Sequence, residues 1–248
     1  MRALLLGLLA SSAVAAEPRT VVFDGEAVAC LVGGKGTDGA GCPDASVGVS
    51  VAPIADGAAS LSVGPLTLLA GNAEEVCGHN RKVGAFDAKP LPQTRKITMM
   101  PLTSGTYVKL VGEAVGVPSP KLTQLFKVDL DGDGKDEVVF AADSGDLIYD
   151  EAGNATSYAF VGVRRIGADG QVKTHLIFQH KEAWTAAQIN DGSVFVAHRF
   201  GKVLGLTDID GDGKAELVVE DGFYEGFSRT VYRVGEKIEA LGAMGCGA

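Results

Sequence analysis

Two short segments of the sequence place carboxylates at alternate positions beside glycine, a pattern that can surround a hard cation. Residues 129–137 read DLDGDGKDE, and residues 208–216 read DIDGDGKAE. Each segment carries aspartate at positions 1, 3 and 5, glycine at position 6 and glutamate at position 9. Calcium takes about six to eight oxygen ligands, and a loop that turns sharply at glycine can present alternate side chains to it. The spacing therefore predicts two Ca2+ sites.

We expect each site to combine four side-chain carboxylates with one backbone carbonyl, while the lysine side chains point to water. The expected metal ligands are Asp129, Asp131, Asp133, Glu137 and the carbonyl of Lys135 in the first loop, and Asp208, Asp210, Asp212, Glu216 and the carbonyl of Lys214 in the second. Without an ion, repulsion among these carboxylates should loosen the loops or raise some of the pKa values. The plain alternative is a solvated Asp-Gly turn between strands. Recurrence of the same spacing favours the cation.

The EF-hand is another calcium motif with this start, but it requires a carboxylate at position 12 and a helix on each side. Position 12 is Phe140 in the first loop and Val219 in the second. The segments EVVF and ELVV that follow the acidic residues are rich in β-branched side chains, which favour strands. The sequence therefore does not fit an EF-hand.

Both loops lie within an internal repeat. In each copy a strand-like run precedes the loop, a second run follows it, and two further runs joined by a tight turn complete the unit. The loops and their flanks resemble FG-GAP and VCBS-type repeats, which also build the β-propeller of integrin α chains. The resemblance covers about residues 105–242 and implies that the same eight carboxylates bind two Ca2+ ions. Two features depart from that family: position 9 is glutamate rather than aspartate, and the Phe-Gly and Gly-Ala-Pro signature is not evident.

Apolar runs bounded by Gly, Asp and Pro recur along the chain, and amphipathic helical periodicity is scarce. We therefore expect a mainly β protein of antiparallel four-stranded repeat units, propeller-like or a partial propeller. The expected division is a β-rich N-terminal region at residues 17–104 and two calcium-loop repeats within residues 105–248. The alternative is two β-hairpins with similar turns and no repeat architecture.

The first residues, MRALLLGLLASSAVAA, have the charged, apolar and small-residue parts of a secretory signal peptide. A buried N-terminal helix is the alternative. We expect residues 1–16 to be removed and the protein to be exported, to the periplasm, the cell surface or the medium. No apolar run is long enough to predict a membrane span.

Four cysteines follow the predicted signal peptide: Cys30, Cys42, Cys77 and Cys246. An even number of cysteines in an exported chain favours disulfides, and four allow three pairings. Cys30 and Cys42 flank a glycine-rich loop that could close locally. We therefore expect the pairs Cys30–Cys42 and Cys77–Cys246.

The rest of the composition offers little chemistry. A formal net charge of −9 without a basic cluster argues against nucleic acid as a partner. The metalloprotease motif His-Glu-x-x-His and the nucleophile elbow Gly-x-Ser-x-Gly are both missing from the sequence. The histidines at positions 79, 175, 180 and 198 share no ligand spacing. We expect no catalytic residues.

The favoured hypothesis is an exported, non-catalytic calcium-binding β-repeat protein that binds or adheres at a surface, with calcium in a structural role. Its expected partner is a protein or a glycan. Two alternatives stay open: a secreted hydrolase or lyase whose site lies in the N-terminal third, and a subunit of a larger surface assembly whose open sheet edge a partner completes.

Overall fold

The computed structural model describes residues 16–71 and 80–247. Most of the predicted signal peptide, together with Cys77 and His79, lies outside these ranges. The protein is mainly β, as predicted. The first half contains β1 (Arg19–Phe23), β2 (Glu26–Val32), β3 (Lys35–Asp38), a 3-10 turn (Gly39–Gly41), β4 (Ala45–Ser50), β5 (Ala52–Pro53), β6 (Gly57–Leu69), β7 (Lys82–Phe86) and β8 (Lys89–Met99).

The second half contains two helices among its strands. Its elements are α1 (Gly105–Val115), β9 (Leu122–Val128), β10 (Glu137–Asp143), β11 (Ile148–Tyr149), β12 (Ala155–Ile166), β13 (Val172–Trp184), α2 (Ala186–Asn190), β14 (Phe200–Thr207), β15 (Glu216–Phe223), β16 (Gly226–Val234) and β17 (Ile238–Gly247). No helix in the described part of the chain is long and apolar enough to cross a membrane.

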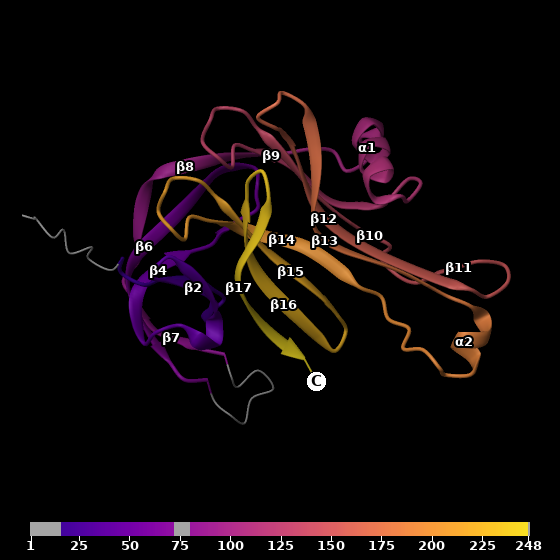
Figure 1. Cartoon of the computed structure of the whole chain (residues 1–248), viewed down its shortest axis with the longest axis horizontal. Helices are drawn as coiled ribbons and strands as arrows, with labels where there is room; N and C mark the ends of the chain where they lie inside the picture. The colour runs from indigo at the N-terminus through magenta and orange to yellow at the C-terminus, as the bar shows by residue number, and fades with distance from the viewer. Residues whose placement is uncertain (1–15, 72–79, 248) are drawn as a thin grey trace, which may run out of the picture.

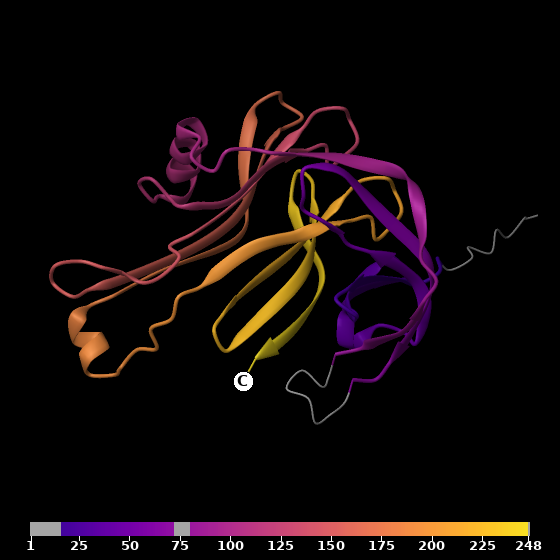
Figure 2. The same cartoon turned by 180° about the vertical axis from the view of Figure 1, so that it is seen from behind.

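The strands form one large and one small sheet. The large sheet runs β11-β12-β10-β9-β8-β6-β4-β1-β2-β3, with β13 beside β12 and β7 beside β2 and β6. The small sheet runs β17-β16-β15-β14-β5. The large sheet curves around the small one, with its N-terminal strands on one side and β9 to β13 on the other (Figures 1 and 2). This curvature encloses the C-terminal strands.

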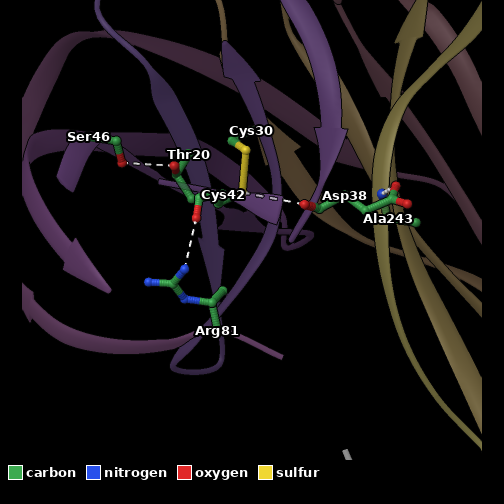
Figure 3. The surroundings of a disulfide bond; sticks show 7 residues. All are labelled: Thr20, Cys30, Asp38, Cys42, Ser46, Arg81 and Ala243. Atoms are coloured by element: carbon green, nitrogen blue, oxygen red, sulfur yellow. Dashed lines mark hydrogen bonds between the residues drawn. A yellow bond between two sulfur atoms is a disulfide. The ribbon is translucent and has the colours of Figure 1, made fainter. Parts of the chain in front are cut away.

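The N-terminal strands close on themselves. Pairing of β6 with β4, β4 with β1, β1 with β2, β2 with β7 and β7 with β6 completes a ring of five strands. Figure 3 shows the disulfide Cys30–Cys42. It lies inside this ring beside buried Leu66 and Leu68, and its Cα atoms are 5.7 Å apart. The predicted local disulfide is therefore confirmed. Cys246 is also disulfide-bonded, but Cys77 is outside the described residues, so the second pairing stays a prediction.

The two acidic loops each lie in an antiparallel run of strands. In the first run β9 pairs with β10, β10 with β12, and β12 with β13. In the second, β14 pairs with β15, β15 with β16, and β16 with β17. Both runs continue further, because β9 also pairs with β8 and β14 also pairs with β5. The pairings therefore do not separate four-stranded sheets, and the propeller-like arrangement stays a prediction.

Strand β15 of the small sheet is buried on both faces. In β15, Leu217 and Val219 contribute to a core shared with the large sheet, whereas Val218 faces a second core formed with β1 and β2. All three side chains are fully buried. This explains the continuous apolar run LVV that follows Glu216, because a strand covered on both faces needs no polar alternation.

Helix α1 was not expected from the sequence. It lays Val111 and Val115 on the outer face of the β9–β10–β12 part of the large sheet, and it ends at Gly116, whose φ of 66° is left-handed. The apolar stripe of this helix is short, which hides its periodicity among the surrounding β runs. The short helix α2 lies in the segment between the two runs and begins with a capping box at Thr185 and Gln188.

Candidate metal centre

Each acidic loop is the turn between two neighbouring antiparallel strands. The first connects β9 to β10, and the second connects β14 to β15. Strand pairing sets Glu137 opposite Val128, and it sets Glu216 opposite Thr207. The glutamate at position 9 of each loop is therefore held beside the residue that precedes the aspartate at position 1. Strand pairing thus brings the first and last predicted ligands of each loop close together.

Side chains of the first loop hold its backbone in a tight coil. The carboxylate of Asp129 accepts hydrogen bonds from the amides of Gly132, at 2.7 Å, and Gly134, at 3.0 Å. Both glycines have left-handed φ values, 74° and 85°, which side chains with a Cβ rarely adopt. Asp131 accepts from the amide of Asp133 at 3.3 Å. The carboxylates therefore point toward the inside of the turn.

The second loop repeats this arrangement. Asp208 accepts from the amide of Gly213 at 3.1 Å, Asp210 from the amide of Asp212 at 3.0 Å, and Asp212 from the amide of Lys214 at 2.8 Å. Gly211 and Gly213 have φ values of 72° and 84°. The same hydrogen bonds at the same loop positions indicate one local structure built twice.

The two glutamates lie deepest in the loops. Glu137 is 5% exposed and Glu216 is 1% exposed. Each carboxylate accepts a hydrogen bond from the residue at loop position 2, from the amide of Leu130 at 2.8 Å and from that of Ile209 at 3.0 Å. Burial raises the pKa of both groups, and it raises the pKa of Glu216 to about 8, with neighbouring aspartates adding to the effect. Raised pKa values were predicted for the metal-free loops, although desolvation outweighs repulsion as their cause.

Three carboxylates converge in each loop. Ligand oxygens within 4.8 Å of one another come from Asp129, Asp131 and Glu137 in the first loop, and from Asp208, Asp210 and Glu216 in the second. Asp208 is only 7% exposed, and its Oδ1 has no hydrogen-bond partner. Burial also raises the pKa of this carboxyl group. A buried oxygen without a donor, beside two further carboxylates, fits a bound cation.

Two predicted ligands lie outside these groups. The carboxylate of Asp133 pairs with Lys135 Nζ at 2.9 Å, and that of Asp212 lies 3.5 Å from Lys214 Nζ. The lysine side chains are 64% and 59% exposed, which agrees with their expected direction toward water. The hydrogen bond from Lys135 holds the pKa of Asp133 below its usual value. The carbonyls of the two lysines stay predicted ligands.

Two arginines that sequence reasoning missed contact the loops. Arg165 on β12 donates to Asp131 Oδ2 at 2.8 Å, and Arg233 on β16 donates to Asp210 Oδ2 at 2.7 Å. The residue before each arginine pairs with the residue after the loop glutamate, so the two occupy equivalent places. A signal was present in the sequence, because β12 and β16 both contain Val-x-Arg followed by Ile or Val, in VRRI and VYRV.

The loops also touch each other. The amide of Ala215 in the second loop donates to the carbonyl of Leu130 in the first at 2.7 Å. Arg95 on β8 donates to the carbonyl of Gly213. The two loops, which are far apart in the sequence, therefore contact each other through their backbones.

No other group of three or more His, Cys, Asp or Glu side chains with metal-binding geometry occurs in residues 16–71 and 80–247. No family model matches the chain, and searches of curated proteins and of solved structures returned no match. The chemistry of the two loops is therefore inferred from their own residues.

Proposed function

We propose that the protein is an exported, non-catalytic binding protein in which two Ca2+ ions stabilise the loops at residues 129–137 and 208–216. The observation that carries the proposal is Asp208, whose buried Oδ1 lacks a partner within a group of three carboxylates. A donor set made only of oxygen suits a hard cation, and a loop of mixed carboxylates and carbonyls suits the flexible coordination of calcium better than the strict octahedron of magnesium.

We further propose that β9–β13 and β14–β17 are two copies of one FG-GAP/VCBS-like unit. The shared hydrogen bonds of the loops, the shared burial of the glutamates and the equivalent arginines support this duplication. The antiparallel pairing of β9 with β10, and of β14 with β15, across each acidic loop also supports a duplicated unit.

Export is supported by Cys30–Cys42, because disulfides persist mainly in oxidising compartments. A surface binding role is supported by an aromatic cluster of Phe195, Phe223 and Tyr224, whose rings lie about 6 Å apart. Phe195 is 56% exposed and Tyr224 is 73% exposed, and Arg199 lies over the ring of Phe223. Exposed aromatic groups of this kind often mark contact sites for a protein or a glycan.

The proposal is tested by thermal unfolding in excess EDTA and in millimolar calcium, with the double variant Asp131→Ala and Asp210→Ala. At free calcium about tenfold above the dissociation constant, each site adds about 1.4 kcal/mol, so two sites should raise the melting temperature by roughly 6–11 °C. The loop variant should lose this rise.

The matched control is the double variant Asp150→Ala and Asp169→Ala, which removes two carboxylates from turns outside the loops. This control should be less stable in both solutions yet keep the calcium response. Identical melts of the wild-type protein with and without calcium would refute the calcium sites.

A further inference from the structure

We propose that Arg165 and Arg233 act as counter-ions to the acidic loops. Each arginine positions the third residue of its loop, Asp131 or Asp210, in the metal-free protein. By doing so, it lowers the affinity of that loop for calcium. The inference rests on the proposed calcium function. It adds that each repeat carries its own competitor for the cation.

In the first loop both oxygens of Asp131 are engaged. Oδ1 accepts the amide of Asp133, and Oδ2 accepts Arg165 at 2.8 Å. The side chains of Arg165 and Asp131 are only 11% and 23% exposed, so water screens this ion pair weakly. Asp131 is one of the three carboxylates that converge in the first loop, and it is already bound to the guanidinium group of Arg165.

The second loop holds its arginine with more carboxylates. Besides Asp210 at 2.7 Å, Arg233 lies 3.5 Å from Glu216 and 3.1 Å from Glu239. Two of these three carboxylates are expected calcium ligands. Arg165, by contrast, has a buried Nε without a hydrogen-bond partner. Competition with calcium should therefore be stronger in the second loop.

The direction of the effect follows from charge. Calcium and a guanidinium on the same carboxylate repel each other across a partly buried site, and the hydrogen bond to the arginine is weakened or lost when the oxygen turns to the ion. Without an ion, the arginine instead offsets the repulsion among carboxylates. The arginine thus stabilises the metal-free loop and disfavours the loaded one.

The test uses the mature full chain and the variants Arg165→Met, Arg233→Met and Arg233→Lys. The control is Arg164→Met, which removes the same charge from the same strand, where the side chain donates to Thr174 rather than to a loop. Calcium titration calorimetry gives the dissociation constants, and unfolding in EDTA gives the stability of the metal-free form.

We expect Arg233→Met to tighten calcium binding by about tenfold, the effect of one charge-assisted hydrogen bond, and to lower the melting temperature in EDTA. Arg165→Met should change both quantities in the same direction by less. Arg233→Lys, which keeps the charge, should stay near the wild-type affinity, and Arg164→Met should leave it unchanged.

The inference would be overturned if the wild-type protein binds calcium and both Arg165→Met and Arg233→Met bind it with the same or lower affinity. That result would still support the calcium sites. Calcium binding that appears only in the methionine variants would support it. Absence of binding in every variant would refute the calcium function, and this inference with it.

Discussion

At the scale of single residues, Glu216 couples the second loop to pH. Its carboxyl group is almost wholly buried, and burial raises its pKa to about 8, while Arg233 opposes the shift. A raised folded-state pKa means that the metal-free protein keeps a proton that the unfolded chain has already released. The contribution of this group to stability is therefore complete below the unfolded pKa, near 4.5, and is lost as pH rises toward about 8.

We predict that the free energy of unfolding in EDTA falls by at most about 1.4 kcal/mol per pH unit across this window because of Glu216. The change Glu216→Gln should flatten this part of the pH dependence, measured by urea unfolding between pH 5 and 8. Exposed Glu151→Gln is the control and should keep the wild-type slope. Parallel slopes for wild type and Glu216→Gln would contradict the raised pKa.

If the second loop binds calcium as proposed, the same proton competes with the ion. Because a metal ligand must be deprotonated, the apparent affinity of the second loop for calcium should weaken as pH falls below about 8.

At the scale of elements, the two loops are joined through their backbones. The amide of Leu130 donates to Glu137, and its carbonyl accepts from Ala215, the residue before Glu216. Leu130 and Ala215 also belong to the core between the sheets. A calcium ion that orders one loop, as proposed, would therefore also fix a hydrogen-bond partner of the other loop.

We predict that the loops bind calcium with positive coupling. The calcium-induced gain in the free energy of unfolding should be larger in the wild-type protein than the sum of the gains in Asp131→Ala and Asp210→Ala. A double-mutant cycle from urea unfolding with and without calcium measures the difference. A wild-type gain equal to that sum would show that the loops act independently.

At the scale of the whole molecule, the N-terminal ring and the C-terminal strands close against each other. Asp38 at the end of β3 accepts the amide of Ala243 on β17 at 2.9 Å (Figure 3). Beside it, Gly36 lies so near the carbonyl of Leu241 that a Cβ would overlap backbone atoms. The backbone of β3 can therefore come this close to that of β17 only because Gly36 has no side chain.

We predict that Gly36→Ala lowers the free energy of unfolding by roughly 1–3 kcal/mol, because backbone cannot yield as a flexible side chain does. The control is Gly105→Ala at the start of α1, where a Cβ meets open space and should be neutral or stabilising by up to about 1 kcal/mol. Urea unfolding of both variants measures these effects. A Gly36→Ala protein as stable as wild type would rule out tight closure here.

Features that depend on neighbours along the chain could be predicted from the sequence. The coil of residues 129–137 and 208–216 is set by alternating aspartates and by glycines that accept left-handed φ values, both of which are local properties. The mainly β class follows from β-branched runs between turns. The pair Cys30–Cys42 closes a short loop, so its ends were close even before folding.

Only the tertiary structure decided which distant residues meet. Alternation along a strand specifies a buried face but not the partner that covers it, so the two-sided burial of β15 and the curvature of the large sheet could not be predicted. For the same reason Arg165 and Arg233 were overlooked, although their positions recur, because strand pairing alone brings them to the aspartates. The sequence by itself determined the charges of the two loops. The fold decided which loop carboxylates are buried away from water and which arginine side chains contact them. Burial and long-range pairing arise only when separate strands assemble.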